Sequence, residues 1–320
     1  MKAAIVRGAQ QAPVFGDFAN PVGAPGKRLI RVTASSLSHV ARSRASGTHY
    51  SSEGGFPFVA GIDGTGIASD GRRVYFLLPE APFGAMAEQC FVDERQCLAI
   101  PDALDETAAA AMAIPGMSSW AALVERAGLR HGETVLVNGA TGASGRLAIQ
   151  IARHLGAGKV IATGRRADTF DELRQLGADV CIAIGQDGLE EALEREFRQG
   201  IDIVLDYLWG PSAEAVLIAA AKAGPDGVPI RHVQIGSASG ASIQLPSAVL
   251  RSSALSLMGS GIGSIALPRL LSAIQGVLAA APVAGFRIRT ESVPLANVAQ
   301  AWASAGSDAR IVLLPQASAG

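Results

Sequence analysis

Residues 135–146 read VLVNGATGASGR, and this stretch decides the fold of the chain. Its apolar start predicts a buried strand, its glycines predict a turn, and residues 146–155 predict a helix. Gly139 permits the tight turn, Gly142 lets backbone N–H groups approach a ligand, and Gly145 allows close packing of the helix. A strand, turn and helix of this kind bind a dinucleotide pyrophosphate at the helix N-terminus; an ordinary strand-to-helix turn is the alternative. We expect cofactor contacts from Asn138, Gly139, Thr141, Gly142, Ala143, Ser144 and Gly145.

The residues after this loop alternate between apolar strands and amphipathic helices. Continuous apolar strands are typical of a parallel sheet that helices cover on both faces. Right-handed crossovers then give an α/β fold with a Rossmann-type, doubly wound parallel sheet. The predicted strands are 135–137, 160–162, 180–184, 203–205 and 232–235, and the predicted helices are 146–155, 170–176, 189–197 and 213–223.

The end of the second strand bears on which dinucleotide is bound. Sites for NAD usually place Asp or Glu there, where the carboxylate accepts a hydrogen bond from the ribose 2′-OH. This strand instead ends in Gly164-Arg165-Arg166, and the first carboxylate after it is Asp168. Two guanidinium groups suit a 2′-phosphate, which they bind through charge-assisted hydrogen bonds. We therefore predict NADPH as the cofactor, with Gly164, Arg165 and Arg166 in its site; the alternative is a pair of solvated loop arginines.

The residues before the glycine loop have a different pattern. Short strands with polar–apolar alternation, punctuated by Gly and Pro, predict a small, partly open β-barrel up to about Pro101. Two helices, 105–112 and 117–127, follow on either side of Pro115. The tail is predicted as helix 268–279, strand 287–293, helix 297–305 and a last strand, 310–314, which could return to the first domain. We divide the chain into domains 1–112, 113–260 and 261–320.

Composition excludes several classes of function. A formal net charge of -1 gives no electrostatic basis for binding nucleic acid or an anionic membrane surface. No apolar run reaches the about 18 residues that a membrane-spanning helix needs, and the start lacks the apolar core of a signal peptide. Cys90, Cys97 and Cys181 are too few and scattered for a disulfide framework, so we interpret them as small apolar side chains. We expect a cytoplasmic protein.

Together with the glycine loop, several short segments make the chain resemble a known family. They are Gly61-Ile62-Asp63-Gly64-Thr65-Gly66, the segment 83–88 (FGAMAE) and the segment 113–123 (AIPGMSSWAAL). The chain resembles the medium-chain dehydrogenase/reductase superfamily, in its zinc-independent quinone oxidoreductase (zeta-crystallin-like) branch. The resemblance implies that 1–112 is the N-terminal part of a GroES-like catalytic domain, that 113–260 is the Rossmann NADP-binding domain, and that 261–320 is a helix and a return to the catalytic domain. It also implies a homodimer, for which residues 254–259 could supply an edge strand; a covered internal strand is the alternative.

Zinc members of that superfamily carry an early Cys ligand, a Gly-His-Glu motif and a four-cysteine lobe. Here the corresponding positions read Ser36-Leu37-Ser38-His39 and Gly61-Ile62-Asp63, and the histidines are scattered. A zinc site needs three or four converging ligands, so we expect no metal. Without a Lewis acid, a conjugated acceptor is favoured over a simple ketone, because it spreads the incoming negative charge and needs only hydrogen-bond donors.

The resemblance places the substrate cleft between the domains, and it points to particular side chains. Ser38 stands where the family usually has Asn, and Tyr50 matches a tyrosine near the nicotinamide; we predict both as catalytic hydroxyl donors. Ser38 could bind either the ribose or the substrate oxygen, and the alternative for Tyr50 is a half-buried side chain that packs a loop. His39 and His49 are alternative donors. Tyr207 and Trp209, after the fourth parallel strand, either flank the cofactor or pack between domains. Gly236 and Ser237 follow the fifth strand and are predicted to face the cofactor, whereas Asp206 is predicted to support its loop.

These observations predict an NADPH-dependent reductase of a conjugated acceptor, a quinone or an α,β-unsaturated carbonyl, that acts by direct hydride transfer without a metal. An enoyl-thioester or alkenal reductase on the same scaffold is one alternative. A non-catalytic NADPH-binding protein is the other, and loss of the family Asn at Ser38 favours it.

Overall fold

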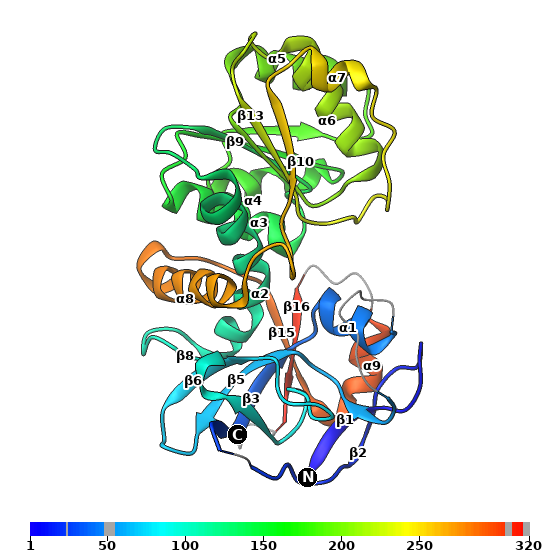
Figure 1. Cartoon of the computed structure of the whole chain (residues 1–320), viewed down its shortest axis with the longest axis vertical. Helices are drawn as coiled ribbons and strands as arrows, with labels where there is room; N and C mark the ends of the chain where they lie inside the picture. The colour runs from blue at the N-terminus through cyan, green and yellow to red at the C-terminus, as the bar shows by residue number, and fades with distance from the viewer. Residues whose placement is uncertain (24, 48–54, 305–308, 316–320) are drawn as a thin grey trace. The chain divides into compact units, whose positions relative to one another are not determined.

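The computed structural model describes residues 1–23, 25–47, 55–304 and 309–315. The chain forms two compact units (Figure 1). Unit 1 contains Met1–Ile114 and Leu278–Gly320, and unit 2 contains Pro115–Val277. The predicted boundary at residue 260 coincides with the end of a strand, whereas unit 2 continues for a further 17 residues into the next helix, to Val277.

Unit 2 is built on a parallel sheet with the strand order β11-β10-β9-β12-β13-β14. Within this sheet, β9 comes first along the chain, and it lies beside both β10 and β12, so the order reverses direction between β9 and β12. This order is that of a Rossmann fold, and it confirms the predicted doubly wound sheet. The strands are β9 (Thr134–Asn138), β10 (Lys159–Gly164), β11 (Val180–Ala183), β12 (Ile203–Asp206), β13 (Ile230–Gln234) and β14 (Leu255–Gly259).

Helices cover this sheet because its strands are apolar on both faces (Figure 1). Leu136, Ile161 and Val204 pack with Leu193, Phe197 and Val216 of two helices in one buried cluster. Another helix packs on β9 and β10. The helices of unit 2 are α3 (Ala143–His154), η3 (Ala167–Thr169), α4 (Phe170–Gln175), α5 (Leu189–Gln199), α6 (Gly210–Ala223) and α7 (Ser247–Arg251). Within the described residues β14 pairs only with β13, so it is an edge strand.

Unit 1 is β-rich, as predicted. One sheet has the order β2-β1-β4, and the other has the order β15-β16-β3-β5-β6-β8, with β7 also paired to β3. The last strand pairs with β3 antiparallel, so the C-terminal segment does return to the first domain. The elements are β1 (Lys2–Val6), β2 (Val14–Asp17), β3 (Lys27–Ser36), α1 (His39–Ala45), β4 (Phe58–Val59), β5 (Asp63–Ala68), β6 (Arg73–Leu77), β7 (Gln89–Asp93), η1 (Glu94–Gln96), β8 (Cys97–Ala99), β15 (Thr290–Pro294), η4 (Leu295–Asn297), α9 (Val298–Ala303) and β16 (Arg310–Leu314).

Two sequence expectations about helices are wrong. The predicted break at Pro115 is absent, because α2 runs from Glu106 to Ala121 with Pro115 inside it and continues as the π-helix η2 (Ala122–Ala127). Complete burial of Ala109, Ala110 and Ala111 outweighs the backbone hydrogen bond that proline removes.

The second wrong expectation concerns length. Residues 106–127 and helix α8 (Leu267–Ala284) are each long and apolar enough to cross a membrane by length and composition. Within the protein, 61% of the first apolar window and 44% of the second are buried. The sequence pattern predicted that Gly and Pro interrupt these apolar stretches, but both helices continue through them.

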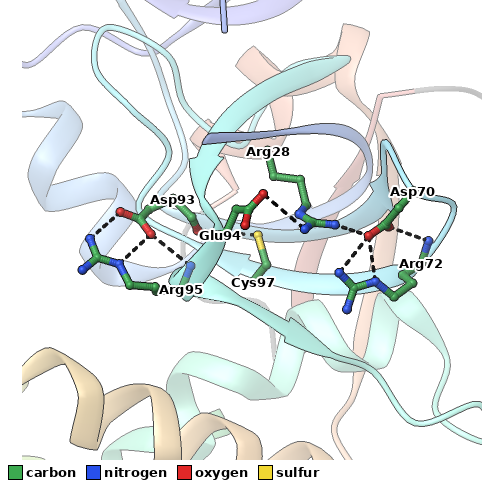
Figure 2. A network of polar contacts seen from close by, with 7 residues as sticks. All are labelled: Arg28, Asp70, Arg72, Asp93, Glu94, Arg95 and Cys97. Atoms are coloured by element: carbon green, nitrogen blue, oxygen red, sulfur yellow. Dashed lines mark hydrogen bonds and ion pairs between the residues drawn. The ribbon is translucent and has the colours of Figure 1, made fainter. Parts of the chain in front are cut away.

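Charged residues at the surface of unit 1 form the network in Figure 2. Arg28 of β3 donates to Asp70 and, at 3.2 Å, to Glu94, and Arg72 also donates to Asp70. Exposed ion pairs of this kind contribute little stability, typically below about 1 kcal/mol each. Cys97 lies beside this network as a free thiol, and its burial raises its pKa to about 11. Burial also raises the pKa of Cys90 and Cys181, so the three cysteines are protonated thiols near neutral pH.

Candidate cofactor site

The glycine loop between β9 and α3 has the backbone that a bound phosphate requires. Gly139 has a φ of +93°, which a side chain would strain. A Cβ on Gly145 would lie 2.4 Å from the carbonyl oxygen of Gly139, whereas a Cβ on Gly142 would meet no atom within 4 Å. Gly142 also begins α3 without any side-chain cap, so the first N–H groups of that helix lack a side-chain acceptor. The loop is thus an open cradle for an anion at a helix N-terminus, and the residues present fit a dinucleotide pyrophosphate.

A network of buried hydrogen bonds supports the glycine loop. The amide of Asn138 donates to Asp206 at 2.8 Å, and its oxygen accepts from Thr163 at 2.7 Å and from Ser212 at 3.0 Å. Thr163 Oγ1 also accepts from the backbone N–H of Gly139 at 3.2 Å. Asn138 is completely buried, so its side chain serves the loop rather than facing outward. The cofactor contact predicted for it stays a prediction.

Asp206, at the end of β12, organises the next loop. One carboxylate oxygen accepts from the backbone N–H groups of Leu208 at 2.9 Å and Trp209 at 3.1 Å, and the other lies 3.3 Å from His232 Nε2. Burial raises the pKa of Asp206, but these hydrogen bonds outweigh burial and hold the pKa below its ordinary value. The predicted supporting role of Asp206 is confirmed, and it keeps Trp209 at a strained φ of 55°.

Tyr207, which follows β12, and Gly236, which follows β13, were predicted as cofactor residues, and they lie beside one another. The loop after β13 packs on the loop after β12, since Ser239 N–H donates to the carbonyl of Leu208 at 2.7 Å. A Cβ on Gly236 would lie 2.7 Å from the Tyr207 carbonyl oxygen, and Ser237 is exposed. The Tyr207 hydroxyl lies 3.4 Å from Ser118 Oγ, and its burial raises its pKa to about 12. Tyr207 is therefore a protonated hydroxyl at the carboxyl edge of the sheet, where open α/β sheets bind ligands.

Arg165 and Arg166 lie directly after β10, and both are exposed. Gly164, the last residue of β10, lies directly before them and packs against the glycine loop. A Cβ added to Gly164 would lie 2.4 Å from Thr141 Cγ2 of that loop. The end of β10 therefore touches the cradle. The two arginines stand next to it, as a site for the adenosine 2′-phosphate requires.

The predicted catalytic residues belong to unit 1. Ser38 is 1% exposed, and its Oγ caps α1 by accepting from the Ala41 N–H at 3.0 Å. His39 begins the same helix; partial burial and the charges of Arg310 and Arg42 lower its pKa, so the imidazole is neutral near pH 7. Tyr50 and His49 lie outside the described residues. The roles predicted for these side chains stay predictions.

Sequence reasoning missed a buried acidic residue in unit 1. Asp63 is completely buried, and the Tyr75 hydroxyl donates to it at 3.1 Å. Burial raises the pKa of Asp63 to about 7, although the Tyr75 hydrogen bond and the charge of Arg310 act in the opposite direction. The alternation of β5 could have placed Asp63 on a buried face, but the closeness of Arg310 depends on strand pairing far along the chain.

The raised pKa of Asp63 predicts a pH dependence of stability. Between about pH 4 and 7 the folded protein holds a proton on Asp63 that the unfolded chain has released, so the free energy of unfolding falls as pH rises through this window. The side chain in Asp63→Asn stays neutral at every pH and keeps an acceptor for Tyr75. We therefore expect this variant to lack the decrease in the free energy of unfolding, which is on the order of a few kcal/mol in the wild type. Urea unfolding at pH 4.5 to 8 measures the difference between variant and wild type. Asp17→Asn is the control, because Lys2 lowers the pKa of exposed Asp17 below this window; parallel pH curves for wild type and Asp63→Asn would contradict the assignment.

Thr163 is a second residue that motif reasoning missed. Thr163→Val keeps the shape but removes the acceptor for Gly139 N–H and the donor to Asn138, and we expect a loss of about 2 kcal/mol in the free energy of unfolding. NADPH affinity should fall several-fold, because the cradle loses its support. Ser212→Ala is the matched control: it removes a bond to the same Asn138 oxygen without touching the loop. Equal NADPH affinities for the two variants, measured by titration calorimetry, would refute a loop-specific role.

Among residues 1–23, 25–47, 55–304 and 309–315, no group of three or more His, Cys, Asp or Glu side chains is placed to hold a metal ion. The fold and the cradle define a two-unit protein with a Rossmann-type dinucleotide-binding unit.

Comparisons with known proteins agree with this class. A family model described as "Zinc-binding dehydrogenase" matches residues 143–276, which lie in unit 2. The chain is 30% identical, over 95% of its length and 96% of the relative's, to a "Probable NADPH-dependent quinone reductase" of Emericella nidulans. It is also 30% identical, over 59% of its length and 51% of the relative's, to the 2-methylene-furan-3-one reductase of Solanum lycopersicum. The quinone oxidoreductase of Thermus thermophilus, solved also as a complex with NADPH, aligns over 98% of this chain and 100% of that one, with a TM-score of 0.81 and 26% identity.

The chain therefore belongs to the medium-chain dehydrogenase/reductase superfamily, in its quinone oxidoreductase-like branch. It is an NADPH-dependent oxidoreductase.

Proposed function

We propose that this protein reduces a conjugated acceptor, a quinone or an α,β-unsaturated carbonyl compound, by direct hydride transfer and without a metal. The observation that carries the proposal is the open glycine cradle beside exposed Arg165. In addition, the chain has Gly61-Ile62-Asp63 where zinc members of the family have the Gly-His-Glu motif. The quinone reductase and the furanone reductase among its relatives support this class of acceptor.

Each group of residues has a separate task in this proposal. NADPH, when bound, supplies the hydride. The N–H groups at the start of α3 hold the pyrophosphate, and Arg165 and Arg166 hold the 2′-phosphate. Ser38 Oγ accepts a hydrogen bond from the Ala41 N–H, and in this proposal its own O–H donates to the acceptor oxygen. Tyr50 is the second proposed donor, and the proton that completes the reduction comes from one of these hydroxyls or from water.

Metal independence follows from the chemistry of the acceptor. A simple ketone places the arriving charge on one oxygen, and its reduction gains most from a Lewis acid. A quinone or enone delocalises that charge, so hydrogen-bond donors such as Ser38 can stabilise it. The apolar side chain of Ile62 offers no ligand where zinc members of the family have His.

The test is the decay of NADPH absorbance with chelator-dialysed protein and a small panel: 1,4-naphthoquinone, an enone and an enoyl thioester. We expect turnover of the quinone or the enone, with no gain on adding Zn²⁺. Turnover of the thioester alone would replace this proposal with an enoyl-thioester reductase. A thermal shift with NADPH but no turnover of any acceptor would favour a non-catalytic NADPH-binding protein.

A further inference from the structure

Unit 1 contains a cavity of about 360 Å³ that no step above uses. It lies among α1, the segment 55–62 that includes β4, and the segment 78–83 that follows β6. A volume of this size is within the range of small-molecule sites, which run from about 300 to 1,000 Å³. The described lining residues are apolar, Gly or Pro except for one, Arg44.

Among the residues that the structure describes, Arg44 has no counter-ion. It lies in the last turn of α1 and is half-buried, and its guanidinium makes no hydrogen bond or ion pair with any described residue. The neighbouring Arg42 differs, because it donates to the Trp302 carbonyl and stacks over the Trp302 ring at 5.3 Å. A partly desolvated guanidinium of a residue that lines an apolar cavity gains most from an anionic group with two oxygens, which it can bind bidentately.

The walls of the cavity suit a flat ligand. The rings of Phe56 and Phe58 lie 5.6 Å apart and are tilted by only 30°, and Phe56 is 44% exposed. Leu78, on the opposite segment, has a φ of 55° and donates its N–H to the Ile62 carbonyl at 2.6 Å. A strained non-glycine residue of this kind persists where surrounding structure imposes it, and such residues cluster at ligand sites.

We propose that this cavity binds the anionic end of the acceptor, an aromatic or quinonoid compound that carries a carboxylate or sulfonate, with Arg44 as its counter-ion. The inference rests on the proposed function and narrows its substrate class. A neutral quinone would occupy the same walls but would leave Arg44 unpaired. The enzyme should therefore prefer the charged member of a matched pair.

The kinetic test compares 1,4-naphthoquinone with 1,4-naphthoquinone-2-sulfonate. For Arg44→Gln, the loss in kcat/KM with the sulfonate should be at least about ten times the loss with the neutral quinone, and it should be mainly in KM. Arg44→Lys should restore part of this difference, and Arg44→Glu should enlarge it. Arg31→Gln removes the same charge from an exposed position outside the cavity and is the matched control. Equal losses with both quinones for Arg44→Gln, or an equal selectivity change for Arg31→Gln, would overturn the inference.

A binding test without turnover separates this inference from the proposed function. 2-Naphthoate cannot accept a hydride, and titration calorimetry measures its binding to the full chain. We expect binding to wild type and at least about tenfold weaker binding to Arg44→Gln, with 2-naphthamide bound weakly by both. If no acceptor is reduced but 2-naphthoate binds through Arg44, the proposed function fails and the anion site stands. If acceptors are reduced but 2-naphthoate binds equally to wild type and variant, only the anion site fails.

Discussion

Gly145→Ala is expected to raise the dissociation constant for NADPH at least about 100-fold, which is about 2.7 kcal/mol. The added Cβ would lie 2.4 Å from the Gly139 carbonyl oxygen and 2.5 Å from the Ala140 Cα. Both atoms belong to the backbone, so no flexible side chain can move to relieve the clash. Either α3 must shift away from the loop or the loop must open, and both changes separate the helix N-terminus from the cradle. Overpacking at such a site also lowers the free energy of unfolding, by about 3 kcal/mol.

Gly142→Ala is the matched control for this prediction. Its Cβ would meet no protein atom within 4 Å, and its φ of −79° suits any residue. Stability should therefore change by no more than about 0.5 kcal/mol, whereas NADPH affinity should fall because the methyl group occupies the approach of the pyrophosphate. Chemical denaturation and calorimetric titration of both variants separate the two effects. A Gly145→Ala protein that binds NADPH as wild type does would show that this loop is not the cofactor site.

Arg165→Ala is expected to raise the KM for NADPH by about 10- to 100-fold while changing the KM for NADH by less than about threefold. A charge-assisted hydrogen bond to a phosphate contributes about 1.5–3 kcal/mol. NADH has no 2′-phosphate and makes no such bond, so removing Arg165 should hardly change its KM. Arg165 is exposed and follows Gly164, which contacts the glycine loop, so its removal leaves the fold and the cradle intact. The double variant with Arg166→Ala should lose more, because two guanidinium groups then leave the same phosphate.

The change in coenzyme selectivity is measured by comparing the KM values for NADPH and NADH in the wild type and in Arg165→Ala. Arg251→Ala, which removes an exposed charge from α7 of the same unit, controls for the change in net charge. We expect this control to alter both coenzymes by the same small factor. If Arg165→Ala weakened NADPH and NADH equally, the arginine would stabilise the loop rather than recognise the 2′-phosphate.

Local pattern was sufficient for most of the parallel sheet. Continuous apolar strands report burial on both faces, and a helix period reports one apolar side, so both can be recognised without knowing their partners. Pro115 shows where this reasoning fails: proline predicts a helix end from local chemistry, yet the packing of Ala109–Ala111 sustains α2 through it. The extent of unit 2 to Val277 likewise depends on contacts and not on the end of β14.

The sequence by itself determined the Rossmann fold, and it predicted the cofactor loop and the arginines beside it. Both inferences are possible because a glycine at a positive φ and a charge at a strand end are local requirements of the backbone and the ligand. Only the tertiary structure decided that Ser38 caps α1, that Thr163 and Asp206 support the cradle, that Asp63 has a raised pKa and that Arg44 lines an apolar cavity. These properties arise from burial and from neighbours that lie far apart in the chain, and desolvation and hydrogen bonding act only once the fold has brought the groups together.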